Sequence, residues 1–316
     1  MRLPDNKLAL AVAFFFLAAG AATAQFTAES RLVVLHVSIA DKRGHLVPNL
    51  KGNDFKVFEN GVQQQLKIFR HEDVPVSMGL LIDDSGSMRE KRARVEASAL
   101  ALVKASNPQD EIFIVNFNDE AFLDVPFTND VSKMQQGLSR IDSRGGTAMR
   151  DAINMSLDYE KAQAKKDKKV LIVVTDGNDN ASSASLERVV QRAVQSDVLI
   201  YAVGLLGEEE RHEAAKAKRA LKELTSSTGG MAFYPKDTSE VNDLALEIAR
   251  DIRSQYTLAY TPQIPDDGSY RQIKVTVDAP GHPVVRTRSG YYATHEGTST
   301  TSTSAAVQPP AINSGK

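Results

Sequence analysis

The chain contains no cysteine. This absence excludes disulfide scaffolds, thiolate zinc sites, Fe–S clusters, thiol nucleophiles and a lipid attached through an N-terminal cysteine. The chain also has no excess of positive charge, because 38 Lys and Arg side chains stand against 40 Asp and Glu side chains, for a net charge of −2. A general nucleic-acid or anionic-membrane binder is therefore disfavoured.

Long apolar runs are missing except at the N-terminus. Residues 8–22 carry no charge, follow Arg2 and Lys7, and end at the small-residue site Ala22-Thr23-Ala24. This order is typical of a secretory signal peptide over 1–24. An uncleaved membrane anchor is the alternative, although residues 8–24 are at the short limit for a spanning helix. We expect a mature protein that is secreted or periplasmic, with no membrane span after signal cleavage.

Two outer segments, 25–75 and 256–294, alternate apolar and polar residues with a period of two. Leu35, Val37 and Ile39 alternate with the polar residues His36 and Ser38 in the first segment, and Ile273 and Val275 alternate with polar neighbours in the second. Such alternation indicates half-buried strands. Each segment alone offers few strands, so we expect the two to pair in one small β-sandwich. The tail at 295–316 has almost no large apolar residue and is predicted to be disordered.

Between these segments, residues 76–255 alternate uninterrupted apolar runs with amphipathic helical patterns. The runs at 78–82, 112–115, 170–174 and 198–203 are typical of strands buried on both faces. The alternation predicts an α/β domain with a doubly wound, mostly parallel sheet. Its last helix is expected to follow a cap at Thr238 or Ser239.

Oxygen-bearing side chains follow the ends of two of these strands. The pattern D-x-S-x-S supplies Asp83, Ser85 and Ser87 after the first strand, and Asp176 follows a later one. Thr147 comes after Gly145-Gly146, at the start of a predicted helix. Each piece taken alone also fits a helix cap or a turn. Together they form an all-oxygen set at one sheet edge, which suits Mg²⁺, Mn²⁺ or Ca²⁺.

These five residues resemble the metal-ion-dependent adhesion site of the von Willebrand factor A (VWA) family. The resemblance covers about 75–254, and the flanks are similar to a bacterial secreted VWA-related subfamily. It implies that Ser85, Ser87 and Thr147 bind the ion directly and that Asp83 and Asp176 act mainly through water. It also implies a function in adhesion, in which an Asp or Glu carboxylate of a protein partner binds the ion. Asp84, at the variable position, adds a further carboxylate.

Two other functions stay open from the residues. The ion could be purely stabilising in a structural assembly subunit, or it could activate water in a hydrolase. Esterase and P-loop motifs, G-x-S-x-G and G-x-x-x-x-G-K-[ST], do not occur in the chain. The run from His212 and Glu213 to Lys216 lacks the second histidine of a zincin helix, so we expect a solvated helix face. No catalytic residue is predicted, and a binding module is preferred to an enzyme.

Overall fold

The structure is a computed structural model that describes residues 32–138, 143–208 and 210–293. The predicted signal peptide at 1–24 and the predicted disordered tail at 295–316 lie outside these residues. Within the described residues, no helix combines the length and the apolar character needed to span a membrane.

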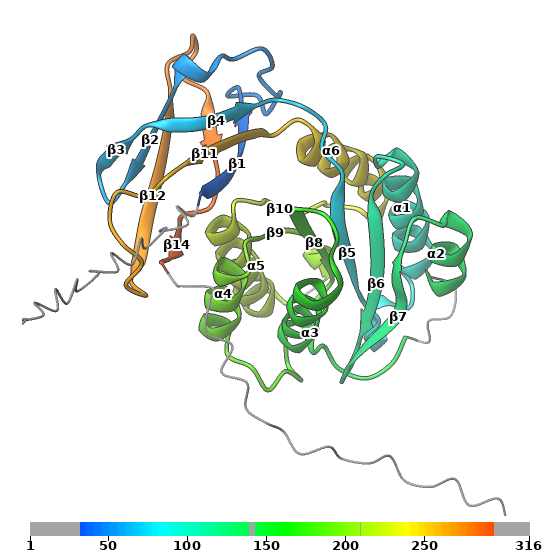
Figure 1. The fold of residues 1–316 in the computed structure, drawn as a ribbon. Helices are drawn as coiled ribbons and strands as arrows, with labels where there is room; N and C mark the ends of the chain where they lie inside the picture. Colours follow the sequence, from blue (N-terminus) through cyan, green and yellow to red (C-terminus); the bar gives the residue numbers. More distant parts are fainter. Residues whose placement is uncertain (1–31, 139–142, 209, 294–316) are drawn as a thin grey trace, which may run out of the picture. The chain divides into compact units, whose positions relative to one another are not determined.

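A six-stranded sheet forms the centre of the α/β part, in the order β10-β9-β8-β5-β6-β7 (Figure 1). All neighbouring pairs are parallel except β6 and β7. The doubly wound, mostly parallel sheet is therefore confirmed. The strands are β5 (Val76–Asp83), β6 (Glu111–Phe117), β7 (Ala121–Thr128), β8 (Lys168–Thr175), β9 (Val198–Gly204) and β10 (Ala232–Phe233).

The antiparallel edge strand β7 was not among the predicted strands. Its sequence contains Pro126 and exposes Phe122 and Leu123, so it lacks the continuous apolar run of a strand buried on both faces. Proline is tolerated on an edge strand, where its missing N–H removes no interstrand hydrogen bond. The tertiary position at the sheet edge therefore accounts for a strand that periodicity alone did not indicate.

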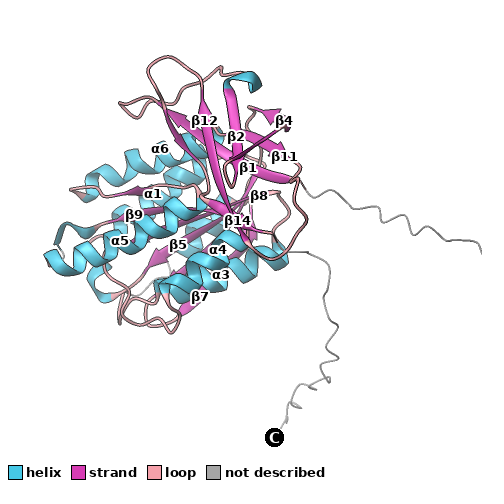
Figure 2. Ribbon diagram, turned by 90° about the vertical axis from the view of Figure 1, so that its left-hand side faces the viewer, coloured by secondary structure: helices cyan, strands magenta, loops and turns pink. Residues whose placement is uncertain are grey.

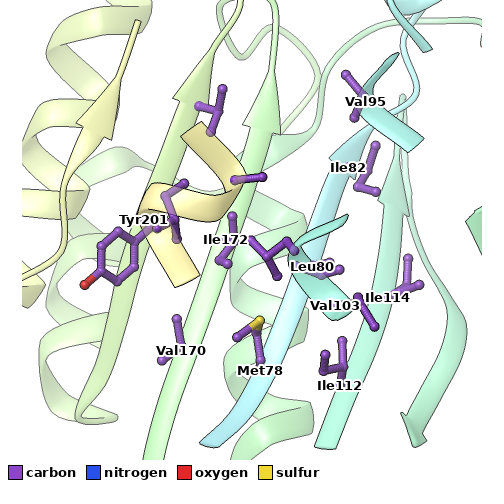
Figure 3. Close-up of a cluster of buried hydrophobic side chains, with 14 of the residues drawn as sticks. Met78, Leu80, Ile82, Val95, Val103, Ile112, Ile114, Val170, Ile172 and Tyr201 are labelled. Atoms are coloured by element: carbon purple, nitrogen blue, oxygen red, sulfur yellow. The ribbon is translucent and has the colours of Figure 1, made fainter. Parts of the chain in front are cut away.

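Helices cover both faces of this sheet, as the ribbon in Figure 2 also shows. One core layer lies between the sheet and α1, α2 and α6, and includes Met78, Leu80 and Ile82 of β5 together with Val95 of α1 (Figure 3). The opposite layer packs against α3, α4 and α5. The helices are α1 (Arg92–Ala105), α2 (Val131–Leu138), α3 (Met149–Gln163), α4 (Leu186–Gln195), α5 (Arg211–Thr228) and α6 (Val241–Arg253).

The predicted cap of the last helix is wrong by one residue or two. Thr238 and Ser239 lie inside a 3-10 turn, Thr238–Glu240, that leads into α6. Asp237 caps this turn, because its carboxylate accepts a hydrogen bond from the Ser239 N–H at 2.7 Å. Aspartate is among the preferred N-cap residues, and here it is already in the extended conformation that a cap requires.

The outer segments pair with each other in two four-stranded sheets, ordered β13-β1-β11-β4 and β14-β12-β2-β3. Their pairs are antiparallel, and each sheet joins strands from both ends of the described chain. The predicted flanking β-sandwich is thus confirmed. The strands are β1 (Val33–Ala40), β2 (Phe55–Glu59), β3 (Val62–Gln64), β4 (Leu66–Arg70), β11 (Tyr256–Tyr260), β12 (Tyr270–Val277), β13 (Val284–Arg286) and β14 (Gly290–Tyr292).

Polar side chains connect the sandwich to the α/β part. Gln255, between α6 and β11, donates to the Ser38 hydroxyl at 3.0 Å and to the Tyr201 hydroxyl at 3.1 Å. Tyr201 in turn donates to Asp251 at 2.6 Å, and the same carboxylate pairs with Arg286 of β13. Buried hydrogen bonds of this kind fix how their elements lie relative to one another, because a buried donor or acceptor that loses its partner costs free energy.

Candidate metal centre

The strands β5 and β8 are neighbours at the centre of the sheet, and the loops that follow them carry the predicted carboxylates (Figure 1). The chain moves from β5 to β6 on one side and later returns to β8 on the other. Such a reversal of strand order opens a crevice at the carboxyl ends of the strands. Asp83 ends β5, and Asp176 directly follows β8.

Four of the five predicted residues form one hydrogen-bonded cluster in this crevice. The Ser85 and Ser87 hydroxyl oxygens are 3.1 Å apart, and Ser87 donates to Oδ1 of Asp176 at 2.8 Å. Asp83 accepts from the Ser85 backbone N–H at 2.9 Å and from the Thr175 hydroxyl at 2.5 Å. The loops after β5 and β8 are thereby held together by side-chain oxygens.

Thr147 is positioned by a separate set of bonds in the loop before α3. Its N–H donates to Oδ1 of Asn180 at 2.8 Å, and the Gly146 N–H donates to Asp119 at 2.7 Å. Gly145 has φ +73°, and a Cβ placed on it would lie 2.2 Å from a carboxylate oxygen of Asp119. Glycine is therefore required for the close approach of Asp119, which in turn fixes the loop that carries Thr147.

The two carboxylates of the cluster differ in how their charge is balanced. Burial raises the pKa of Asp83 to about 6, against the opposing hydrogen bonds from Thr175 and Ser85. Within the described residues, Asp83 has no ion pair with a cationic side chain. Asp176 has one, because the Lys91 ammonium lies 2.7 Å from its Oδ2 and both side chains are buried. A cation beside Asp83 would offset the cost of burying its charge.

Asp84 is held away from the exposed part of the crevice. The residue is 7% exposed, and its Oδ1 accepts a hydrogen bond from the Ser143 hydroxyl at 2.9 Å. Its backbone N–H and carbonyl bond Phe117 and Arg144. The extra carboxylate that the sequence places at the variable position thus also fastens the loop containing Ser143.

A cavity of about 180 Å³ lies over the cluster and is open to solvent. Ser85, Ser87 and Thr147 all line it, so the three predicted hydroxyls share one space. Nitrogen and sulfur ligands are not part of this arrangement, and the described residues hold no group of three or more His, Cys, Asp or Glu side chains placed to bind a metal. The donor set, neutral hydroxyls backed by two buried carboxylates, fits a hard cation such as Mg²⁺.

Several contributing residues were not identified from the sequence. Lys91 and Asn180 bond the predicted residues Asp176 and Thr147, and Asp119 bonds Gly146, next to Thr147. Asn180 stands in a polar run just after Asp176 that could have indicated it. The helix face at 212–216 is solvent-accessible, as expected, but Glu213 has a further position that the sequence did not indicate. Its side chain, which is 36% exposed, lines the open cavity and accepts from Asn178 at 3.0 Å, because α5 begins beside the loop that follows β8. His212 is exposed, as expected.

Comparisons with known proteins agree with this architecture. The model of the von Willebrand factor type A domain matches residues 78–247. Mouse integrin alpha-11 is 32% identical over 105 residues, which are 31% of this chain and 9% of the integrin. Horse calcium-activated chloride channel regulator 1 is 26% identical over 174 residues, 52% of this chain and 18% of the regulator.

The chain thus spans less than a fifth of the length of these two relatives. A solved structure, the von Willebrand factor type A protein from Catenulispora acidiphila, has the same fold at a TM-score of 0.51 and 12% identity, covering 82% of this chain and 73% of that one. The family model covers more than half of the chain and spans the central sheet with its crevice. The chain belongs to the von Willebrand factor type A domain family.

Proposed function

We propose that this protein is an exported, divalent-metal-dependent binding module. It captures an acidic side chain of a protein partner through a cation held in the crevice between the loops after β5 and β8. The observation that carries the proposal is that three neutral hydroxyls, from Ser85, Ser87 and Thr147, line one open cavity above two buried carboxylates.

The division of labour among the five residues supports this function. Ser85, Ser87 and Thr147 would hold the cation directly, whereas Asp83 and Asp176 would act on it from behind through water. When bound, a divalent cation supplies positive charge for an incoming carboxylate. Direct ligation by neutral hydroxyls adds no formal negative charge, so the ion keeps most of its attraction for a partner's Asp or Glu. We infer Mg²⁺ as the ion, with Mn²⁺ and Ca²⁺ as the other hard cations that this donor set accepts.

Lys91 and Thr175 prepare the cluster for this role. Lys91 holds one oxygen of Asp176, which leaves the other oxygen to orient the Ser87 hydroxyl. Thr175 does the same for Asp83, whose second oxygen fixes the Ser85 backbone. Outer hydrogen bonds of this type orient metal ligands, and their loss typically costs about 10–100-fold in metal affinity.

The hydrolase alternative is less well supported than binding. A hydrolase needs a base that can take a proton from water, and Glu213 is the carboxylate that lines the cavity. Hydrogen bonds from Lys216 and then His212 lower the pKa of Glu213, which makes it a weak base. The arrangement therefore favours an adhesion or assembly role over catalysis.

The experiment titrates the mature protein with Mg²⁺ and Mn²⁺ by calorimetry, and then captures partners from the envelope and secretome of the producing cell with and without chelator. Thr147→Ala and Ser85→Ala should weaken metal binding and partner capture together. Ser132→Ala, which removes an exposed hydroxyl from α2, is the matched control. Partner capture that persists undiminished in chelator would overturn the proposal. Partner capture that needs the metal but is unaffected by blocking the partner's carboxylates would show a purely stabilising ion.

A further inference from the structure

A larger cavity, of about 600 Å³, lies between the α/β part and the sandwich. It shares no lining residue with the cavity above Ser87. The α5 helix ends at its rim, where Gly229 adopts φ +93° and turns the chain toward β10. Its walls come from the end of α5, the β10 segment, β12 and the chain from β13 toward β14: Lys222, Thr225, Ser226, Gly230, Met231, Ala232, Tyr234, Ile273, Lys274, Val275, Val285, Arg286, Thr287, Arg288 and Ser289.

The charge of these walls has one sign. Four of the lining residues are cationic and none is acidic. The guanidinium groups of Arg286 and Arg288 are paired with Asp251 and Asp197. Lys222 of α5 and Lys274 of β12 are exposed and form no ion pair with any described residue. The cavity therefore carries two cationic side chains whose charge no described carboxylate balances.

Two strands at the ends of their sheets, β10 and β13, contribute residues to this cavity. The strand β10 is the last strand of the central sheet, and the Met231 carbonyl accepts from the Ala202 N–H of β9. Successive residues of a strand direct their backbone groups to opposite sides, so Ala232 directs its N–H and carbonyl away from β9, toward the open edge. Among the described strands, β13 also ends its sheet, and β14 pairs with β12 only over Tyr270–Gln272.

Free backbone donors and acceptors at a sheet edge are a template for an added strand. Binding by strand addition obtains affinity from main-chain hydrogen bonds and specificity from alternate side chains. Lysines on both sides of the cavity would select carboxylates at those alternate positions, and charge-assisted hydrogen bonds are the stronger kind. Apolar lining from Tyr234 and Val285 suits the remaining side chains.

We propose that this cavity binds an extended acidic segment of a partner protein, which adds as a strand along the β10 edge while its carboxylates contact Lys222 and Lys274. This surface is separate from the metal centre and needs no metal. A partner could then be bound at two places: a single carboxylate at the cation and an extended acidic segment here.

The test uses the full mature chain in chelator and a fluorescent peptide of alternating glutamate and valine, acetylated and amidated at its ends. Fluorescence anisotropy should show saturable binding. The double variant Lys222→Glu and Lys274→Glu should weaken it by about tenfold or more, because it removes both cationic contacts and places two negative charges beside the peptide carboxylates. Lys133→Glu, an exposed reversal on α2, should leave the affinity unchanged. Unfolding midpoints of the variants check that the fold is retained.

Further probes separate the ligand classes. A peptide with N-methyl groups on alternate amides should bind at least about tenfold more weakly, because it cannot complete the strand pairing. Equal binding of the methylated peptide, or complete displacement by glutarate at equal concentration, would identify a small-anion site and overturn the proposal. Absence of saturable binding would overturn it as well. Binding that is lost in chelator or in Asp83→Ala would place the peptide at the metal centre, which contradicts this inference while supporting the proposed function.

Discussion

Two buried carboxylates, Glu59 in the sandwich and Asp83 at the crevice, are each 2% exposed but are balanced in different ways. Glu59 accepts from Arg271 at 3.0 Å, from Tyr260 at 2.5 Å and from Tyr291 at 2.9 Å. Asp83 accepts from neutral groups of Ser85 and Thr175. Glu59 therefore has a countercharge within the sandwich, whereas Asp83 has no ion pair with a described cationic side chain.

The proposed function accounts for this difference between the two carboxylates. Glu59 joins β2 to β11, β12 and β14, so it links the two ends of the described chain. A charge with a structural role needs permanent partners, since unpaired burial is costly. A charge that serves reversible cation binding must remain incompletely compensated. The predictions below test this contrast.

The largest effect is expected from Glu59→Ala. It leaves the Arg271 guanidinium buried without its main partner, and breaking one side of a buried pair costs about 3–5 kcal/mol. Chemical unfolding should show this loss equally with Mg²⁺ and with chelator. Asp267→Ala is the matched control, because the half-exposed Asp267 contacts the same guanidinium at 3.1 Å. Its cost should be about 1 kcal/mol or less. Equal losses for the two variants would contradict internal compensation by Glu59.

The next effect concerns Lys91→Met. In chelator this variant leaves Asp176 buried without the ammonium at 2.7 Å, so the free energy of unfolding should fall by about 3 kcal/mol. Saturating Mg²⁺ should restore part of the loss, because the bound cation would balance the negative charge of Asp176. Lys104→Met, at an exposed position of α1, should change little. The same loss in both conditions would mean that Lys91 acts through packing and not through charge.

A somewhat smaller effect is expected from the cation itself. Magnesium at 100 times its dissociation constant should raise the free energy of unfolding of the wild type by about 2.7 kcal/mol. Asp83→Asn should lose most of this response, yet remain close to the wild type in chelator, because it removes a charge that burial disfavours. A variant strongly destabilised in chelator would show that Asp83 has a structural role like that of Glu59.

Much of this organisation was predictable from sequence. Buried apolar runs indicated four of the six central strands, and D-x-S-x-S with Asp176 indicated the crevice residues that the hydrogen bonds bring together. Whether all five residues bind a metal stays a prediction. The short strand β10 and the edge strand β7 were not identified, since neither has a buried run long enough to be recognised.

Long-range polar partners were the other part that sequence could not provide. Lys91 and Asp176 lie 85 positions apart, and Glu59 and Arg271 lie 212 apart. Periodicity reports which face of a strand is buried, but it carries no information on which charge will lie opposite. Asp237 is different, because a capping aspartate can be recognised from the sequence, yet the prediction placed the cap at Thr238 or Ser239.

The smallest expected effect is on the pH dependence of stability, at the junction between the sandwich and the α/β part. His36 of β1 is partly buried, and burial together with the nearby cations Lys168 and Arg288 lowers its pKa to about 3. In the unfolded chain the pKa is near its usual 6.5, so between pH 6.5 and 3 the unfolded state binds a proton that the folded state does not. Stability should therefore fall as the pH falls through this window. Lys168, one of the two nearby cations, donates a hydrogen bond to the backbone carbonyl of Ile252.

His36→Gln removes this term, so the variant should lose less stability than the wild type between pH 7 and pH 5.5. We expect the losses of the two proteins to differ by less than about 1 kcal/mol. The binding of one proton changes the free energy of unfolding by at most about 1.4 kcal/mol per pH unit, and His36 is only partly buried. The measurement is the urea midpoint of both proteins at the two pH values. His45→Gln, which changes an exposed histidine in the same segment, is the control. If His36→Gln leaves the change in stability between the two pH values unaltered, the folded junction does not disfavour the charged imidazole. The acid sensitivity would then come from the buried charges of the crevice and the sandwich.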